Sequence, residues 1–373
     1  MTSEQMGSRR VPAWGAPLLE RLNRIMSLGI EQGVFPGGVV LVRRANEIIV
    51  HEAYGHSFTH QDVRTISLHP VTTRRDTIYD LASITKLFTA TCVMQLVDEQ
   101  KLQLDDPMGR YLPEFAANDK TEMTVRQLLT HVSGLPNLRL WEEATTFEAR
   151  MRYVMAVTPE FPPGTALMYH DTNFIVLGKL VEEVDGRALD QTMRARVLAP
   201  LGLHHTRYGP LNSTTVDVAA TEDESYIGRG MVVKEAHDEN AWCLGGVAGH
   251  AGIFSTARDL SIFAQMYLNG GIYNGAEVLT SGTVTEMTRN QIGDLGSRGL
   301  GWQLNASYYM GSLASPQTYG HTGFTGTSIL IDPQRELVIV LLTNRVHPTR
   351  HGPDVNSVRR AVADAVVTAV DAE

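Results

Sequence analysis

The spacing of hydrophobic residues predicts a helix near the start of the chain and a β-hairpin directly after it. Apolar side chains recur every three or four positions over residues 18–30, and Gly33 marks the point where that helix would end. Two runs rich in valine and isoleucine follow over residues 38–43 and 47–53. The short turn Ala45-Asn46 lies between them, which is typical of two paired strands.

The same pattern returns at the other end of the chain. Residues 327–331 and 337–342 are apolar runs separated by Asp332-Pro333-Gln334, which predicts a second hairpin. A helical pattern over residues 356–370 closes the chain, whereas residues 83–240 are mostly helical or loop. We therefore expect an α+β fold in which both chain ends build one antiparallel sheet, flanked by terminal helices, with a mostly helical insert.

This plan divides the chain into two expected domains. Residues 1–82 and 241–373 would form a discontinuous sheet domain, and residues 83–240 would form the mostly helical domain. A chain of 373 residues exceeds one typical domain, which agrees with such a division. Because pockets often form where domains meet, we expect the active site in the cleft between them.

Composition narrows the possible partners and locations. A net charge of −9 argues against nucleic acid as a partner. Two cysteines, Cys92 and Cys243, cannot form a disulfide framework, and we expect both to be buried hydrophobic residues. The segment Met1–Gln5 has no apolar core, and no apolar stretch is long enough to cross a membrane, which predicts a cytoplasmic protein without a membrane span.

Ser83 and Lys86 are the most informative pair of residues. They lie three residues apart at the start of a predicted amphipathic helix whose apolar side chains recur over residues 87–97. Residues three apart in a helix are neighbours, so the amine can reach the hydroxyl. A serine beside a lysine is one way to make a nucleophile without a catalytic histidine.

The alternative is that Ser83 serves only as the N-cap of this helix. A capping box would place Glu or Gln three residues later, where this chain has Lys86. A cation in the first turn is opposed by the helix dipole, and burial would add to that effect. We therefore expect a lowered pKa for Lys86, which would suit a base.

Two further stretches carry polar side chains at the ends of predicted elements. Tyr169-His170-Asp171 precedes a helix with one apolar face, and it could be only a turn in which Asp171 caps that helix. His321-Thr322-Gly323 follows a predicted strand and precedes the second hairpin, and it could be only a glycine-rich turn.

In this order the three stretches resemble the serine β-lactamase and penicillin-binding-protein superfamily. That pattern is Ser-x-x-Lys, then Tyr-x-Asn, then Lys-Thr-Gly or His-Thr-Gly on an edge strand of the sheet. The resemblance covers about residues 18–370 and is closest to the class C-like branch, which includes family VIII carboxylesterases and D-aminopeptidases. Further matching stretches are residues 128–135, 163–165, 246–252, 255–260 and 320–333.

The resemblance implies a role for each of these residues. Ser83 would be the nucleophile, Lys86 would hold or accept its proton, and Tyr169 would be the general base. The backbone N–H groups of Ser83 and Phe324 would form the oxyanion hole. Asp171, His321, Thr322 and Gly323 would contact the substrate. No metal or organic cofactor is implied.

Two positions depart from the family pattern. Asp171 stands where the family usually has Asn, and a carboxylate cannot donate the amide hydrogen bond that holds an acylamido substrate. It could instead pair with Lys86 and keep that lysine charged, which would favour Tyr169 as the base. His321 replaces a lysine, and an unperturbed histidine is mostly neutral at pH 7. Both changes weaken recognition of a β-lactam or a peptide carboxylate.

We therefore expect a serine hydrolase that works through an acyl-enzyme, most simply a carboxylesterase on small or short-chain esters. The alternative is a D-Ala-D-Ala carboxypeptidase, a D-aminopeptidase or a β-lactamase. A third possibility is a non-catalytic sensor related to penicillin-binding proteins. The expected partner is a small-molecule ester, amide or β-lactam, and the sequence leaves the oligomeric state open.

Overall fold

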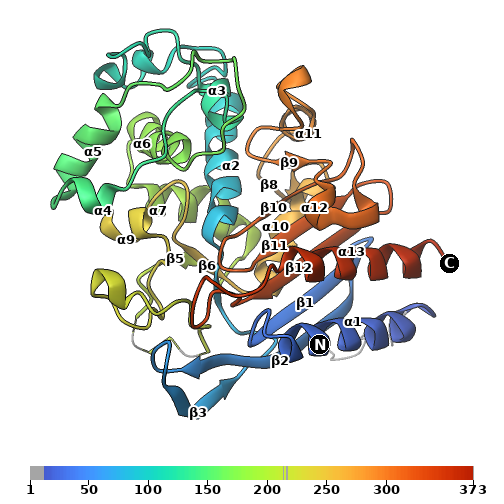
Figure 1. Ribbon diagram of the computed structural model, residues 1–373. Helices are drawn as coiled ribbons and strands as arrows, with labels where there is room; N and C mark the ends of the chain where they lie inside the picture. Colours follow the sequence, from blue (N-terminus) through green and yellow to red (C-terminus); the bar gives the residue numbers. More distant parts are fainter. Residues whose placement is uncertain (1–11, 213, 216, 373) are drawn as a thin grey trace, which may run out of the picture.

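The computed structural model describes residues 12–212, 214–215 and 217–372. The fold is built on a seven-stranded antiparallel sheet with the strand order β3-β2-β1-β12-β11-β10-β9 (Figure 1). The strands are β1 (Gly37–Arg44), β2 (Glu47–His60), β3 (Ile66–Thr72), β9 (Gln303–Leu304), β10 (Tyr319–Thr322), β11 (Ser328–Asp332) and β12 (Leu337–Thr343). The prediction of one sheet built from both chain ends is confirmed.

The two ends of the chain meet in the middle of this sheet. Strand β1 pairs with β2 on one side and with β12 on the other, and Leu41 lies opposite Val340. Side chains of β1 alternate between the two faces, as in any strand. Val40 packs in the cluster that contains the terminal helices, whereas Leu41 packs in the cluster that contains the helical region.

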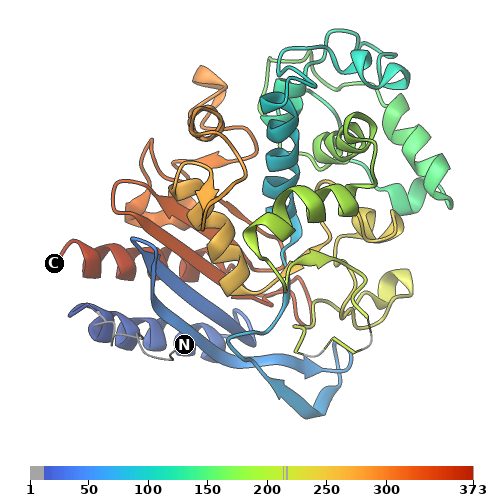
Figure 2. The same cartoon turned by 180° about the vertical axis from the view of Figure 1, so that it is seen from behind.

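Helices cover both faces of the sheet. Helices α1 (Gly15–Glu31) and α13 (Asn356–Val370) lie side by side on one face, and α10 (Ala257–Leu268) covers the other (Figures 1 and 2). The bounds of α13 agree with the prediction from the sequence, and α1 begins three residues before its predicted apolar run. The terminal helices therefore flank the sheet as expected.

The remaining helices and short strands connect these layers or form the helical region. The helices are α2 (Thr85–Asp98), α3 (Val125–Leu129), α4 (Leu140–Glu143), α5 (Phe147–Ala156), α6 (Thr172–Asp185), α7 (Leu189–Met193), α8 (Ala199–Leu201), α9 (Glu239–Cys243), α11 (Ser281–Thr288) and α12 (Ser307–Met310). The short strands are β4 (Tyr79–Asp80), β5 (Arg207–Tyr208), β6 (Ile253–Ser255), β7 (Ile272–Tyr273) and β8 (Ala276–Glu277). Strands β4, β6 and β5 form a small separate sheet, in that order.

Helix α2 differs from its prediction. The sequence pattern favoured one buried face, but every residue from Thr85 to Met94 is buried. The helix packs against α6 and α7, and Phe88 stacks on Phe263 of α10 with ring centroids 4.1 Å apart. Because protein surrounds its first turns, α2 has no solvent face there. Cys92 on this helix is buried, and so is Cys243, as expected.

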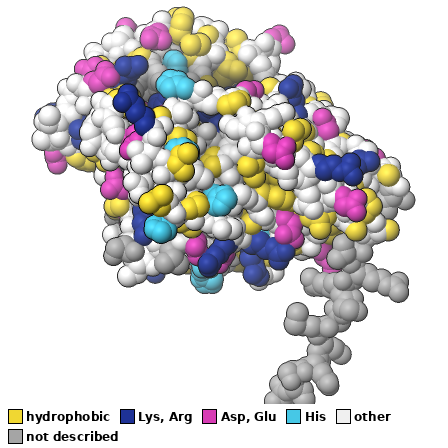
Figure 3. Space-filling model, turned by 60° about the horizontal axis from the view of Figure 1, so that its bottom comes forward, with side chains coloured by type: hydrophobic (Ala, Val, Ile, Leu, Met, Phe, Trp, Pro, Cys, Tyr) yellow, Lys and Arg dark blue, Asp and Glu magenta, His cyan; other side chains and the backbone are white. Residues whose placement is uncertain are grey.

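The outer strand β3 is exposed. Ile66 and Leu68 of this strand are 71% and 87% exposed. The face brought forward in Figure 3 mixes hydrophobic side chains with charged and histidine side chains. None of the described helices is long and apolar enough to span a bilayer, and the Met1–Gln5 segment lies outside the described residues.

Candidate active site

Ser83 and Lys86 are in contact. Ser83 lies in a 3₁₀ turn, Ala82–Ile84, that leads into α2, and Lys86 is in the first turn of that helix. Lys86 Nζ donates a hydrogen bond to Ser83 Oγ over 2.9 Å. The predicted contact is therefore confirmed. The N-cap position of α2 is Ile84, so Ser83 does not act as its cap.

Lys86 is held as an ammonium ion. Its Nζ also donates to Asp171 Oδ1 over 2.7 Å and to the carbonyl oxygen of His250 over 3.3 Å. Burial alone would lower the pKa of Lys86, but Asp171 and Tyr169 together raise it above its usual value. The prediction of a lowered pKa was wrong, because it did not count the partner carboxylate. An ammonium group that donates three hydrogen bonds has no lone pair to accept a proton.

Asp171 faces Lys86 instead of capping the following helix. It occupies the N-cap position of α6, but its side chain makes no capping hydrogen bond. Tyr169, two residues earlier, has its ring centroid 4.9 Å from Lys86 Nζ and 4.4 Å from the His131 ring. The structure thus brings Ser83, Lys86, Tyr169 and Asp171 together, and Tyr169 remains 36% exposed.

The end of β10 packs against the turn that carries Ser83. Strand β9 pairs only with Tyr319 and Gly320, so the His321-Thr322 half of β10 lies at the edge of the sheet. A Cβ atom on Gly323 would lie 2.4 Å from the carbonyl oxygen of Leu81. No larger residue fits this approach, which explains the glycine of the third motif.

His321 is buried and neutral. Its Nδ1 lies 2.8 Å from the carbonyl oxygen of Thr322, and its Nε2 is buried with no hydrogen-bond partner among the described residues. Burial, reinforced by the positive charges of Arg298 and Lys86, lowers the pKa of His321 well below its usual value. The prediction of a neutral histidine at pH 7 is confirmed.

Ser83 opens into a pocket of about 360 Å³. Its polar and aromatic lining residues are Ser83, Tyr169, Gln303, Tyr308, His321, Thr322, Phe324, Arg345, Asp354, Asn356 and Arg359. The Phe324 ring is 48% exposed, and the Arg345 guanidinium lies 4.7 Å from its centroid. With two arginines and one carboxylate, the charged lining of this pocket is basic.

Arg298 is a site residue that the sequence did not reveal. Its guanidinium carbon lies 5.2 Å from the centroid of the Tyr169 ring, although Arg298 does not itself line the Ser83 pocket. Its Nη1 is buried without a hydrogen-bond partner, and no described carboxylate forms an ion pair with it. Burial lowers the pKa of Arg298, and Tyr169 and Tyr308 only partly offset this effect. It stands alone in a loop, outside any motif, so no sequence signal could have marked it.

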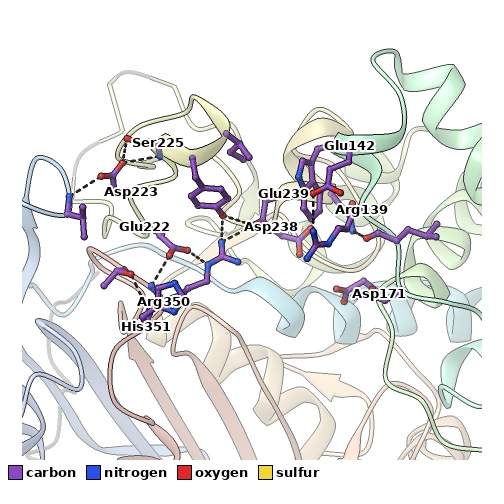
Figure 4. A pocket seen from close by; sticks show the side chains of 18 residues that line it. Arg139, Glu142, Asp171, Glu222, Asp223, Ser225, Asp238, Glu239, Arg350 and His351 are labelled. Carbon is purple, nitrogen blue, oxygen red and sulfur yellow. Dashed lines mark hydrogen bonds and ion pairs between the residues drawn. The ribbon is translucent and has the colours of Figure 1, made fainter.

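A second and larger cavity borders the other side of the Lys86–Asp171 pair. Its volume is about 820 Å³, and Asp171 forms part of its wall. Glu222, Asp223 and Arg350 come from one side of it, and Arg139, Glu142 and Asp171 from the other (Figure 4). We call this cavity the acidic chamber, because six carboxylates and two arginines line it: Glu142, Asp171, Glu222, Asp223, Asp238 and Glu239, with Arg139 and Arg350.

Ion pairs already engage many of these carboxylates. His250 Nε2 lies 2.7 Å from Asp238 Oδ1, and Arg350 Nη2 lies 2.8 Å from Glu239 Oε1. Deeper in the protein, His237 Nε2 lies 2.9 Å from Glu222 Oε2. Burial alone would lower the pKa of His237, but its glutamate neighbours raise it. The His237 ring therefore lies against carboxylates that favour its protonated form.

Comparison with known proteins identifies the family of the chain. A family model described as Beta-lactamase matches residues 22–364. A Salmonella agona protein named "Putative D-alanyl-D-alanine carboxypeptidase" is 34% identical over 375 residues, covering 91% of this chain and 85% of that protein. The alignment thus covers most of both proteins.

Solved structures share the fold. A family VIII carboxylesterase has a TM-score of 0.73 at 23% identity, covering 95% of this chain and 98% of that one. A class C beta-lactamase has a TM-score of 0.76 at 17% identity, covering 96% of this chain and 100% of that one. At these identities the likeness shows the β-lactamase/transpeptidase-like fold alone. With the family model matching residues 22–364, the chain belongs to the beta-lactamase family of serine hydrolases.

Proposed function

We propose that the protein cleaves substrates through an acyl-enzyme on Ser83, and that its preferred substrate carries a carboxylate in the leaving group. A peptide ending in D-alanyl-D-alanine is the first candidate. The guanidinium of Arg298 beside Tyr169, which forms no ion pair with any described carboxylate, is the observation that carries this proposal.

The reaction uses the contacts of Ser83. Ser83 Oγ attacks the substrate carbonyl carbon, and its proton passes to the oxygen of Tyr169, which would act in its phenolate form and lines the same pocket. That proton then goes to the leaving amine as the acyl bond breaks. Lys86 remains an ammonium throughout and stabilises negative charge on Ser83 Oγ, to which it donates. Water, deprotonated by Tyr169, releases the acyl group and restores Ser83.

The developing oxyanion would be held by two backbone N–H groups, those of Ser83 and Phe324. Such preorganised donors act where charge develops, and removing one typically costs about 10²–10³-fold in kcat. The close approach of Gly323 to Leu81 supports this assignment, because it brings the segment before Phe324 against the turn of Ser83.

Arg298 supports a carboxylate in the leaving group. A half-buried cation with no ion-pair partner among the described residues is costly, and a substrate carboxylate would supply the missing charge. Arg298 lies against the ring of Tyr169, which itself lines the Ser83 pocket together with Thr322 and two further arginines, Arg345 and Arg359. Because His321 is neutral, it would not be the cation that recognises this carboxylate. The curated relative at 34% identity is named for this kind of activity, which favours the same substrate class.

The acidic chamber would take the acyl part of the substrate. Pockets of about 300–1,000 Å³ accommodate drug-sized ligands, so the chamber has room for more than a short acyl chain. Its polar wall suits a peptide-like group better than a hydrocarbon chain.

A short-chain ester is the second candidate substrate. The neutral His321 and the carboxylate at position 171 favour it, because neither can contribute the charge or the amide donor that a β-lactam needs. A small ester requires only the nucleophile, its base and the oxyanion hole. Both candidates therefore share one mechanism and differ in the role of Arg298.

Replacing Arg298 with glutamine tests this role. We expect kcat/KM for an acyl-D-alanyl-D-alanine peptide to fall about 10- to 100-fold, because a charge-assisted hydrogen bond contributes about 1.5–3 kcal/mol. Hydrolysis of p-nitrophenyl butyrate, which has no carboxylate, should change less than about threefold. Arg43→Gln is a control, since Arg43 is buried and its guanidinium likewise lies over a tyrosine ring, that of Tyr273.

Parallel assays of the wild type with the peptide, the ester and nitrocefin complete the test. An equal loss on ester and peptide would make Arg298 a support for Tyr169 rather than a carboxylate anchor. Turnover of the ester with none of the peptide would favour the carboxylesterase. Binding of a β-lactam without any turnover would favour the non-catalytic sensor.

A further inference from the structure

Asp80 is a buried carboxylate just before the turn that carries Ser83. It ends strand β4, and its side chain accepts two backbone hydrogen bonds. Asp80 Oδ1 accepts the N–H of Ala82 over 2.8 Å, and Oδ2 accepts the N–H of His237 over 2.7 Å. One carboxylate thus connects the turn of Ser83 to a distant loop.

The hydrogen bond to Ala82 fixes an unusual backbone conformation. Ala82 has a φ of +48°, in the left-handed region that non-glycine residues rarely adopt. Such a conformation costs of order 1–3 kcal/mol and persists only where surrounding contacts hold it. Ser83 is the next residue, so this conformation sets the direction of the Ser83 N–H group.

Asp80 also contacts the segment that carries Phe324. The backbone carbonyl oxygen of Asp80 accepts a hydrogen bond from the hydroxyl of Thr325 over 2.8 Å. The Asp80 side chain accepts the backbone N–H of His237, and the ring of His237 stacks on the ring of Phe324. The two ring centroids are 5.6 Å apart, and the ring planes differ by 24°. Asp80 therefore reaches Phe324 both through its neighbour Thr325 and through His237.

We propose that Asp80 is a positioning residue that holds the two halves of the oxyanion hole, the Ser83 and Phe324 N–H groups, in one frame. This inference rests on the proposed acyl-enzyme reaction. Asp80 itself does not touch the substrate, and it does not line the pocket of Ser83. Its effect is on geometry, and errors of a fraction of an ångström in such donors matter most in the transition state.

The test uses two variants of the full chain and the rate at which a fluorophosphonate labels Ser83. Asp80→Asn replaces one carboxylate oxygen with an N–H₂ group, so only one of the two backbone N–H groups of Ala82 and His237 keeps an acceptor. Thr325→Val removes only the hydroxyl contact and keeps the shape of the side chain. We expect labelling to slow about 10- to 100-fold in Asp80→Asn and about 3- to 10-fold in Thr325→Val.

Asp259→Asn is the matched control. Asp259 is also a buried carboxylate, and it accepts the His205 N–H and the Thr206 hydroxyl in the α10 region. We expect Ser83 in the Asp259→Asn variant to be labelled at the wild-type rate, even if the melting temperature of the variant falls. A tetrahedral adduct with phenylboronic acid provides a second readout, and its affinity should fall in step with the labelling rate, which a loss of stability alone would not produce.

The outcomes separate this inference from the function on which it rests. A wild type that is not labelled at Ser83 would overturn the acyl-enzyme proposal and the role of Asp80 with it. A wild type that is labelled, with both variants labelled equally fast, would overturn the positioning role alone. If Asp80→Asn does not fold, Asp80→Glu takes its place, because it keeps both acceptor oxygens but displaces them; labelling of that variant at the wild-type rate would overturn the positioning role.

Discussion

Replacing Lys86 with methionine is expected to lower kcat by about 10³-fold or more, a large loss even for a group that acts in proton transfer. Methionine keeps much of the volume but removes the positive charge that contacts Ser83 Oγ and Asp171. Steady-state kinetics on p-nitrophenyl butyrate measure the loss. Lys120→Met is the matched control, because Lys120 is equally buried but donates to the carbonyl of Val157.

Tyr169→Phe belongs to the same experiment. It removes the hydroxyl of the proposed base while keeping the ring that packs against His131, and we expect a loss in kcat of similar size. Residues that act as a unit give non-additive losses, so the double variant with Lys86→Met should be little worse than either alone. Full additivity, or an active Tyr169→Phe enzyme, would contradict Tyr169 as the base.

Replacing Asp171 with alanine should destabilise the fold by about 3 kcal/mol, because it leaves the fully buried Lys86 ammonium without its partner. Asp171→Asn should lose less, since its carbonyl oxygen can still accept from Lys86. Urea unfolding at pH 7 measures both. Glu142→Ala is the control, because its ion pair with Arg139 is exposed and should contribute less than about 1 kcal/mol.

The stability lost in Asp171→Ala should depend on pH in a direction that follows from the pKa of Lys86. Burial alone would lower the pKa of Lys86, but Asp171 and Tyr169 raise it, so the folded wild type binds this proton more tightly than the unfolded chain. That stabilisation is fully present below the unfolded lysine pKa of about 10.4 and is lost as pH rises through the folded value.

In Asp171→Ala, the Lys86 ammonium loses its partner carboxylate, so we expect burial to lower the pKa of Lys86 in the folded state. The unfolded chain then binds the lysine proton more tightly than the folded chain. The variant should therefore gain stability with rising pH, and its difference from the wild type should narrow between about pH 7 and about pH 10. A difference that stays constant over this range would mean that Asp171 acts through packing rather than charge.

Most of the fold could be predicted because hydrophobic periodicity marks elements that are half buried. Helix α13 and the strands β1, β11 and β12 lie close to their predicted bounds. Strand β3 was missed, since it is an exposed outer strand with a proline, Pro70, and no alternation of buried and exposed residues. Helix α2 was misjudged because its burial depends on neighbours that are distant in sequence.

The site was predictable only where its residues are close in sequence. The three-residue spacing of Ser83 and Lys86 predicts their contact from helix geometry alone. The charge state of Lys86 depends on Asp171, 85 residues away, and the resemblance only suggested that pair. The roles proposed for Arg298 and Asp80 rest on tertiary contacts, which no local sequence pattern predicts.

The most direct test of Ser83 as the nucleophile is to identify the residue that a covalent inhibitor modifies. The intact protein is treated with a fluorophosphonate, digested and mapped by mass spectrometry, with Ser83→Ala treated in parallel. We predict one label, on the peptide that contains Ser83, and no label on the variant. A label on another residue, or equal labelling of Ser83→Ala, would contradict Ser83 as the nucleophile.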